Sequence, residues 1–214
     1  MNFKQLFIFT VLILSNSLLY AQKFELGKVT ASELQEKVHP LDSSASAAML
    51  FKKAKTTFDY SFKNGFSTIH EYVYRIKIYK KEGLSQANFR VPYYIGYENL
   101  NKDVVKFSDA VTYNLENGKI IKTKLNNEGS FKEDVNDYWA QATITMPNVK
   151  VGSVIEFKYV LKTEAIINFP VFDFQEEIPV NYAEYKTEIP GFYNYKTVLL
   201  GSVKVNSDSI YKSH

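Results

Sequence analysis

The sequence predicts a mainly β protein, a large antiparallel β-sandwich with a short N-terminal helix. From about Ala47 onward, segments dense in Tyr, Phe, Ile, Val and Thr alternate with Gly, Pro and Asn. Many short strands at this spacing, with almost no helical pattern between them, are typical of a sandwich. The 214 residues include 16 Tyr, 16 Phe and no cysteine. A hydrophobic core, without disulfides, must therefore supply the stability.

The first 21 residues predict a cleavable secretory signal peptide. A cationic start with Lys4 precedes an apolar run over 6–14, and the small residue Ala21 stands before Gln22, where we expect cleavage. The apolar run is well short of the roughly 20 residues that span a bilayer, and without a cysteine no lipid anchor can form. We therefore expect an exported protein, in the periplasm or outside the cell, with no membrane span after signal removal.

A polar lead-in separates the signal from the β region. Thr30 and Glu33 have the spacing of a capping box, which predicts a short helix over Ala31–Lys37 that ends before Pro40. The expected organisation is a signal peptide at 1–21, the lead-in at 22–46, a β-sandwich at 47–205 and, at 206–214, a truncated linker or the start of a next element.

The segment Glu71–Tyr79 alternates as a strand does. One face carries Tyr72, Tyr74, Ile76 and Ile78, and the other carries Val73, Arg75, Lys77 and Tyr79. We expect the first face in the core and the second in solvent.

A hairpin is predicted where 110–115 and 119–125 flank Asn117-Gly118, the pair that a type I′ turn requires. Its register places Glu116 opposite Lys119 and Leu115 opposite Ile120. A second hairpin is predicted from Asp137–Met146 and Ser153–Thr163, joined by a loop from Pro147 to Gly152. Further strands are expected near Val171–Ile178, Tyr182–Ile189 and Tyr195–Leu200.

The charge pattern argues against a nucleic-acid partner. The chain has 26 basic residues, one of them Lys4 in the signal, against 23 acidic ones. Only Arg75 and Arg90 are arginines, and the lysines do not form the concentrated basic face of such proteins.

No catalytic, cofactor or metal site is predicted. The absence of cysteine excludes a thiol nucleophile, a Cys-ligated zinc and an iron–sulfur cluster. His39, His70 and His214 have no second ligand at metal spacing, and no serine lies in a G-x-S-x-G context. The adjacent Glu176 and Glu177 would point to opposite faces of a strand, so they cannot act as a pair.

Two alternatives stay open. Glu133, Asp134 and Asp137 could bind a hard cation such as calcium, although their spacing matches no known loop. Aromatic rows could form a carbohydrate-stacking platform, although such residues more often pack in a β domain. These rows are Tyr93, Tyr94 and Tyr97, and Tyr182, Tyr185, Phe192, Tyr193 and Tyr195.

Several separated motifs resemble one bacterial family. They are MPNVKVGSVIEFKY at 146–159, FQEEIP at 174–179, EYKTEIP at 184–190, Arg75-Ile76-Lys77-Ile78 with Gly83 downstream, and the segment 113–119. Their order and spacing over roughly 45–200 resemble domain of unknown function 3857, the N-terminal domain of exported bacterial transglutaminase-like proteins. The matching positions, interpreted as structural, are Arg75, Gly118, Pro147, Asn148, Gly152, Glu156, Gln175, Pro179 and Pro190.

The resemblance implies a non-catalytic accessory domain that precedes a papain-like Cys-His-Asp domain. This chain has no cysteine and ends at His214, so no catalytic residue of that domain can be assigned to it, and we expect a piece of a longer protein. The expected partner is the downstream transglutaminase-like domain, which this domain would support or whose protein substrate it would recruit. The alternative is a free-standing secreted glycan- or peptide-binding module.

Overall fold

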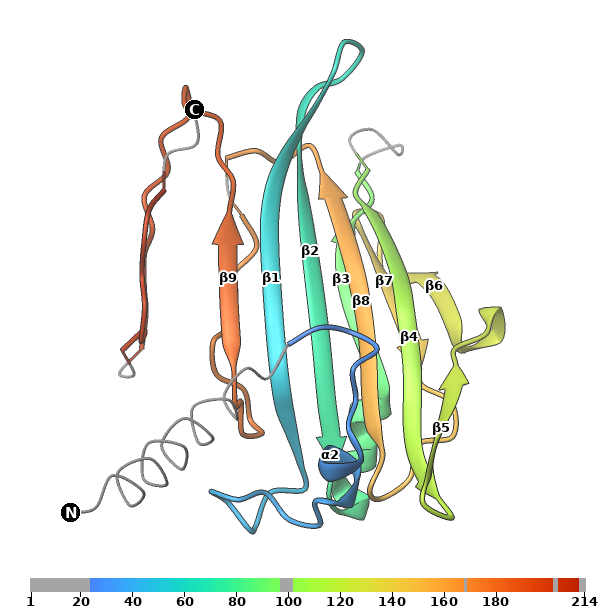
Figure 1. The fold of residues 1–214 in the computed structure, drawn as a ribbon. Coiled ribbons are helices and arrows are strands. Elements are labelled where there is room, and N and C mark those ends of the chain that lie inside the picture. Colours follow the sequence, from blue (N-terminus) through green and yellow to red (C-terminus); the bar gives the residue numbers. More distant parts are fainter. Residues whose placement is uncertain (1–23, 97–101, 168, 202–203, 212–214) are drawn as a thin grey trace, which may run out of the picture.

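The computed structural model describes residues 24–96, 102–167, 169–201 and 204–211, and within them two sheets face each other (Figure 1). The large sheet has the order β5 (Lys119–Lys124), β4 (Val104–Glu116), β8 (Val154–Thr163), β2 (Gly65–Ile78), β1 (Ala47–Ser61) and β9 (Ala183–Thr187). The small sheet has the order β3 (Asn88–Tyr94), β7 (Trp139–Thr145) and β6 (Ser130–Asp134). Short helices are α2 (Ala31–Gln35), η2 (Lys81–Ala87) and η4 (Asn127–Gly129). The predicted β-sandwich with a short N-terminal helix is confirmed.

The main core lies between the two sheets. Its large-sheet side consists of the alternating residues Tyr72, Tyr74, Ile76 and Ile78 of β2 and Ile155, Phe157, Tyr159 and Leu161 of β8. The small sheet contributes Val91, Tyr93, Ala140, Ala142 and Ile144. The two-residue period of the sequence thus identified correctly the face of β2 that is buried between the sheets.

The short helix forms as the capping box predicts, over Ala31–Gln35. The backbone N–H of Glu33 donates to the Thr30 hydroxyl at 3.2 Å, and the backbone N–H of Thr30 donates to the Glu33 carboxylate at 2.6 Å. Both bonds satisfy donors that a helix start leaves without a partner.

The β4–β5 hairpin also has the predicted turn and register. Asn117 and Gly118 have φ of 50° and 76°, as a type I′ turn requires. Glu116 pairs with Lys119, and Leu115 pairs with Ile120.

The predicted hairpin between 137–146 and 153–163 is wrong. β7 pairs with β3 and β6 in the small sheet, whereas β8 pairs with β2 and β4 in the large one. The loop between them crosses from one sheet to the other, and Gly152 fixes its end by donating its N–H to the Ile78 carbonyl at 2.9 Å. Both strands have a strongly apolar face, and these faces bury each other across the core instead of lying side by side.

Of the three later strands predicted, one forms. β9 lies within the predicted 182–189, and it pairs with β1 in parallel at the edge of the large sheet. No strand forms over 171–178 or within 195–200. The edge of β1 is already occupied by β9, so the segment 171–178 instead packs across the sheet, where Phe172 stacks on Tyr185 with ring centroids 5.3 Å apart.

The predicted signal peptide, with its cleavage position at Ala21 and Gln22, lies outside the described residues, as do Tyr97 and His214. Within the part of the chain that is described, no helix is long and apolar enough to cross a membrane.

Candidate functional site

The outer face of β2 is not in solvent, contrary to the expectation. Arg75, Lys77 and Tyr79 are all buried, and Val73 is half-buried. The reason is the segment 24–46, here called the N-terminal strap, which crosses this face of the large sheet and carries α2 (Figure 1). Alternation alone cannot reveal such a cover, because the strap is polar and distant in sequence.

Arg75 is the centre of a buried ionic network under the strap. Its guanidinium donates to Glu156 on β8 at 2.6 Å, to Glu33 of α2 at 2.8 Å and to the carbonyl of Glu25 at 2.7 Å. The second oxygen of Glu156 accepts the backbone N–H of Gly27 at 2.7 Å. Each of these two buried charges therefore has a partner of opposite charge and a hydrogen bond with the main chain, which Arg75 donates and Glu156 accepts, as a buried pair needs.

Lys77 holds the strap in a second place. Its ammonium donates to the carbonyls of Leu34 at 2.9 Å and Gly152 at 2.6 Å. Burial lowers the pKa of Lys77 to about 8. Next to it, the hydroxyl of Tyr79 donates to Glu36, and burial together with this carboxylate raises the pKa of Tyr79.

The structure brings together three of the nine family-motif positions, because Arg75 binds Glu156 directly and Lys77 joins Gly152 to the same strap. The other six lie in turns and loops. Gly118 is in the β4–β5 turn, Pro147 and Asn148 follow β7, Gln175 is exposed, and the carbonyls of Pro179 and Pro190 accept backbone N–H groups of Met49 and Tyr193. Their structural interpretation stays a prediction.

His70 lies in a buried polar chain on the inner face of the large sheet. Its Nδ1 is 2.7 Å from the Thr56 hydroxyl, its Nε2 is 3.0 Å from the Thr68 hydroxyl, and Thr56 also contacts the Tyr185 hydroxyl at 3.0 Å. Burial lowers the pKa of His70 to about 4, so the ring is neutral at pH 7. These hydrogen-bonded side chains connect β1, β2 and β9. His39 belongs to the strap instead, and its Nε2 lies 2.8 Å from the Asn181 side-chain oxygen.

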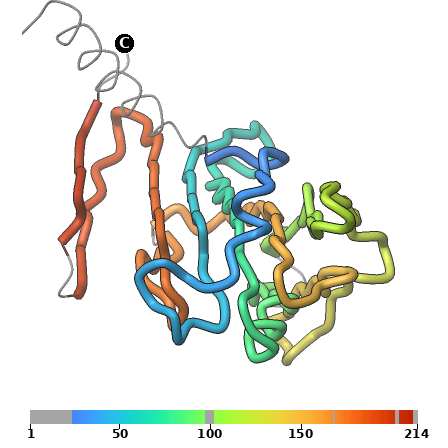
Figure 2. The backbone as a smooth tube through the Cα atoms, turned by 60° about the horizontal axis from the view of Figure 1, so that its bottom comes forward, coloured from blue at the N-terminus to red at the C-terminus, as the bar shows by residue number. Residues whose placement is uncertain are grey.

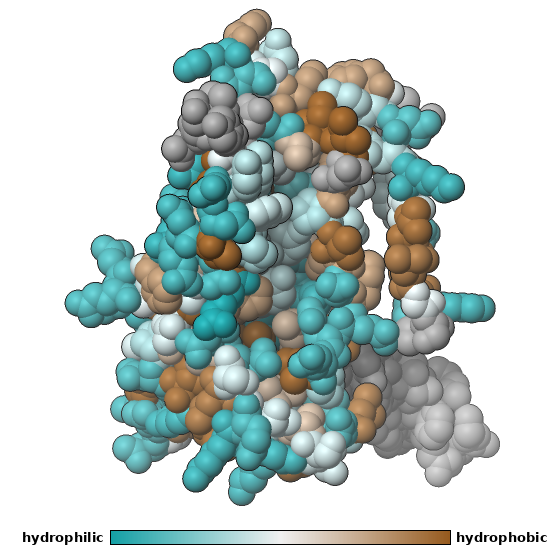
Figure 3. All heavy atoms as spheres, turned by 180° about the vertical axis from the view of Figure 1, so that it is seen from behind, coloured by the Kyte–Doolittle hydropathy of each residue, from teal (hydrophilic) through white to brown (hydrophobic). Residues whose placement is uncertain are grey.

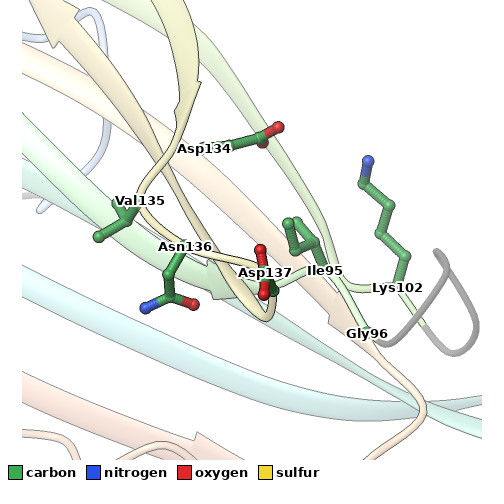
Figure 4. Close-up of a pocket in the computed structure, with 7 residues that line it drawn as sticks. All are labelled: Ile95, Gly96, Lys102, Asp134, Val135, Asn136 and Asp137. Carbon is green, nitrogen blue, oxygen red and sulfur yellow. The ribbon is translucent and has the colours of Figure 1, made fainter.

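The carboxylates that the sequence left open as a calcium site do not come together. Asp134 and Asp137 border a shallow depression of about 370 Å³ between the end of β3 and the β6–β7 loop, and Figure 4 shows their carboxylates lying apart. Glu133 instead accepts a hydrogen bond from Gln141 at 3.1 Å. Over the described ranges, no group of three or more His, Asp or Glu side chains is placed to hold a metal ion.

The aromatic rows that the sequence left open as a carbohydrate-stacking platform do not form one. Tyr93 is buried in the core, and Tyr94 packs on Trp139 with centroids 5.7 Å apart. Tyr182 stacks on Phe24 at 4.0 Å, and its hydroxyl donates to Glu184 at 2.6 Å, which raises the pKa of Tyr182 to about 12. Of the two rows, Phe192 is the member that is largely exposed among the described residues.

A different set of rings gathers at the tip of the β1–β2 hairpin. This aromatic end cluster consists of Phe58, Tyr60, Phe62, Phe66, Phe169, Phe192, Tyr193 and Tyr195, each within 6.1 Å of another ring in the cluster. Phe192, Tyr193 and Tyr195 belong to the second aromatic row named from the sequence, whereas the other five members were not expected to gather. The sequence does carry a signal for this cluster, because aromatic residues occupy every second position from Phe58 to Phe62.

The architecture is that of a two-sheet β-sandwich whose buried charges fasten an N-terminal strap. The chain belongs to the family described as a domain of unknown function with solved structure, DUF3857, whose model matches residues 65–209. The link of this family to transglutaminase-like proteins remains what the resemblance implies.

One solved structure similar to the chain is described as that of a "putative protease" from Parabacteroides distasonis, with a TM-score of 0.48 and 14% sequence identity. The similarity covers 63% of this chain and 27% of that one, so the similar part spans about a quarter of that protein. No curated protein matches the sequence at a significant level.

Proposed function

We propose that this chain is the non-catalytic N-terminal β-sandwich domain of an exported transglutaminase-like protein, and that it supports the papain-like domain that follows. Membership of the DUF3857 family, with the motif resemblance described above, supports this context. The observation that carries the proposal is an exposed apolar segment after β9.

The described parts of this segment, 198–201 and 204–211, lie beside β9 and outside the two sheets (Figures 1 and 2). Its largest apolar side chains are exposed, with Leu200 and Ile210 each 93% accessible. The other exposed apolar residues of the segment are Val198, Leu199, Val205 and Tyr211. Several large exposed apolar side chains in one short segment are typical of an interaction site. We assign the next domain of the same protein as its occupant, since this segment is the part of the accessory domain nearest to that domain in sequence.

The ionisable groups of the outer face agree with a supporting role. Arg75, Lys77 and Glu156 are all buried, and each is bonded to the strap or to a β-strand neighbour. They fasten one part of the domain to another. With no cysteine, the chain also lacks the nucleophile of the papain-like mechanism.

The test compares the longer protein with residues 22–214. We expect Leu200→Asp and Ile210→Asp to lower the unfolding temperature of the longer protein and to increase hydrogen exchange over 198–211, with little effect on residues 22–214 alone. Val104→Asp, at another exposed valine, is the matched control and should leave both unchanged.

Two results would contradict the proposal. One is equal behaviour of the Leu200 and Val104 variants in the longer protein. The other is cleavage or cross-linking of amide bonds by purified residues 22–214, which would place catalysis in this chain.

A further inference from the structure

The tip of the β1–β2 hairpin presents an aromatic side chain on a well-defined turn. Ser61 pairs with Gly65, so three residues, 62–64, form the loop. Gly65 has φ of 74°, and the backbone N–H of Asn64 donates to the Ser61 hydroxyl at 3.0 Å. This geometry fits a three-residue hairpin loop that closes with a left-handed glycine. Phe62, the first loop residue, is 100% exposed.

The exposed rings rest on an inner layer of packed rings. Phe66 lies 5.5 Å from Phe192 and 5.6 Å from Tyr193 between centroids, and Tyr193 stacks on Phe58 at 5.3 Å. Phe58 and Phe66 are half-buried by these contacts. The layer joins the hairpin to the chain after β9, and it therefore holds the outer rings in place before any ligand binds.

Three rings form the outer surface of the cluster. Phe62 is fully exposed, Phe192 is 70% exposed and Tyr60 is 54% exposed. Tyr60 connects the other two, because it lies 5.7 Å from Phe62 and 4.9 Å from Phe66, the ring that contacts Phe192. In Figure 3 the upper end of the molecule, where this tip lies, carries hydrophobic side chains among hydrophilic ones.

Polar groups accompany the rings. The Asn64 amide donates to the Glu164 carboxylate at 3.2 Å, and both side chains lie at the surface beside the turn. On the opposite face of the hairpin, Lys162 and Asp59 form an exposed ion pair at 2.6 Å. With Lys63 in the turn and Glu164 beside it, the charges of the tip cancel.

We propose that the aromatic end cluster is a carbohydrate-binding surface for neutral glycans. The C–H faces of a pyranose ring complement the negative face of an aromatic ring, and its hydroxyls need donors and acceptors at the rim. Phe62, Tyr60 and Phe192 supply the ring faces. Asn64 and Glu164, together with the Tyr60 hydroxyl, supply the hydrogen-bonding groups.

The charge and the size of this surface favour a glycan over a membrane or a protein partner. An anionic bilayer would need a basic surround, whereas the charges here cancel. A stable protein interface buries about 800 Å² on each partner. Three rings that each present at most about 200 Å² offer less than that. A sugar of a few residues matches the size of the surface.

The proposal does not depend on a downstream domain, so residues 22–214 suffice for its test. Isothermal titration would use hexasaccharides of β-1,4-linked glucose, β-1,3-linked glucose, β-1,4-linked xylose and β-1,4-linked N-acetylglucosamine. We expect at least one of them to bind, and Phe62→Ala to weaken that binding about tenfold, as the loss of one ring contact implies. Phe62→Tyr should keep the affinity within a few fold.

The matched control is Phe131→Ala, which removes a half-exposed phenylalanine from β6 of the other sheet and should not change the affinity. Absence of binding to all four hexasaccharides would overturn the proposal, and so would an equal loss in the Phe131 variant. Vesicles of phosphatidylcholine with phosphatidylglycerol serve as the competing probe. Binding to them that is lost in Phe62→Ala, without sugar binding, would assign the surface to membranes instead.

Discussion

The two ends of the β1–β2 hairpin differ in which side chains they bury and which they expose. At the end near α2, the charged side chains Arg75 and Lys77 are buried, and the strap provides their partners. At the turn, the apolar rings of Phe62 and Tyr60 are left in solvent. Buried charges that are fully paired hold parts of the fold together, whereas exposed rings contribute little to its stability. The comparison separates what holds the domain together from what is available to a ligand.

The largest expected effect is at the charged end. Arg75→Met leaves the Glu156 carboxylate buried without its counterion, so we expect the free energy of unfolding to fall by about 3–5 kcal/mol. Urea denaturation measures this. The control is Lys158→Met, which breaks the partly exposed pair with Glu71 and should cost about 1 kcal/mol or less. Equal losses in the two variants would mean that the network under the strap is no stronger than a surface pair.

The next effect is on pH dependence. The pKa of His70 is about 4 in the folded protein, below its ordinary value of 6.5. The unfolded chain therefore takes up the proton first as pH falls, and this contribution to stability is complete above pH 6.5 and is lost progressively toward pH 4. The expected loss is about 3 kcal/mol.

Urea denaturation at a series of pH values tests this expectation. His70→Gln cannot titrate, so its stability should depend less steeply on pH between 6.5 and 4 than that of the wild type. Identical slopes for wild type and His70→Gln would contradict the assignment.

A smaller effect is expected at the start of the strap helix. Thr30→Ala removes the hydroxyl that accepts the Glu33 N–H, and N-cap losses of this kind cost about 1 kcal/mol. Limited proteolysis should then cut the strap faster, because α2 has only five residues. Thr30→Ser keeps the cap and should protect the strap as threonine does.

The smallest effect on stability is expected at the turn. Phe62 is fully exposed, so Phe62→Ala should change the free energy of unfolding by no more than about 0.5 kcal/mol. Thermal denaturation of the same variant that is used for sugar binding checks this. A large loss of stability would mean that the ring belongs to the fold and not to a binding surface.

Short-range sequence patterns predicted the secondary structure well, but they did not predict which distant segments cover the faces of the sheets. The capping box, the Asn117-Gly118 turn and the two-residue period of β2 each involve neighbours in sequence, and all three are confirmed. The burial of Arg75 depends on a strap about fifty residues earlier, and the separation of β7 from β8 depends on which other strands are available to pair. Neither condition is visible in a short window of sequence.

The candidate binding surface was missed for a related reason. Phe58, Tyr60 and Phe66 alternate as core residues do, and the sequence does not show that the long hairpin extends past the small sheet. The small sheet covers only part of this face of the hairpin, and the part that it does not cover is left at the surface.

The hydrogen bond from Gly27 to Glu156 spans 129 residues and has a consequence for the order of folding. The strap is synthesised first, and β8, which carries its anchor, follows more than a hundred residues later. The β1–β2 hairpin can form early from local contacts, but the strap must wait, since distant closures come late. The outer face of β2 is therefore uncovered until β8 is present, and the strap docks late in folding.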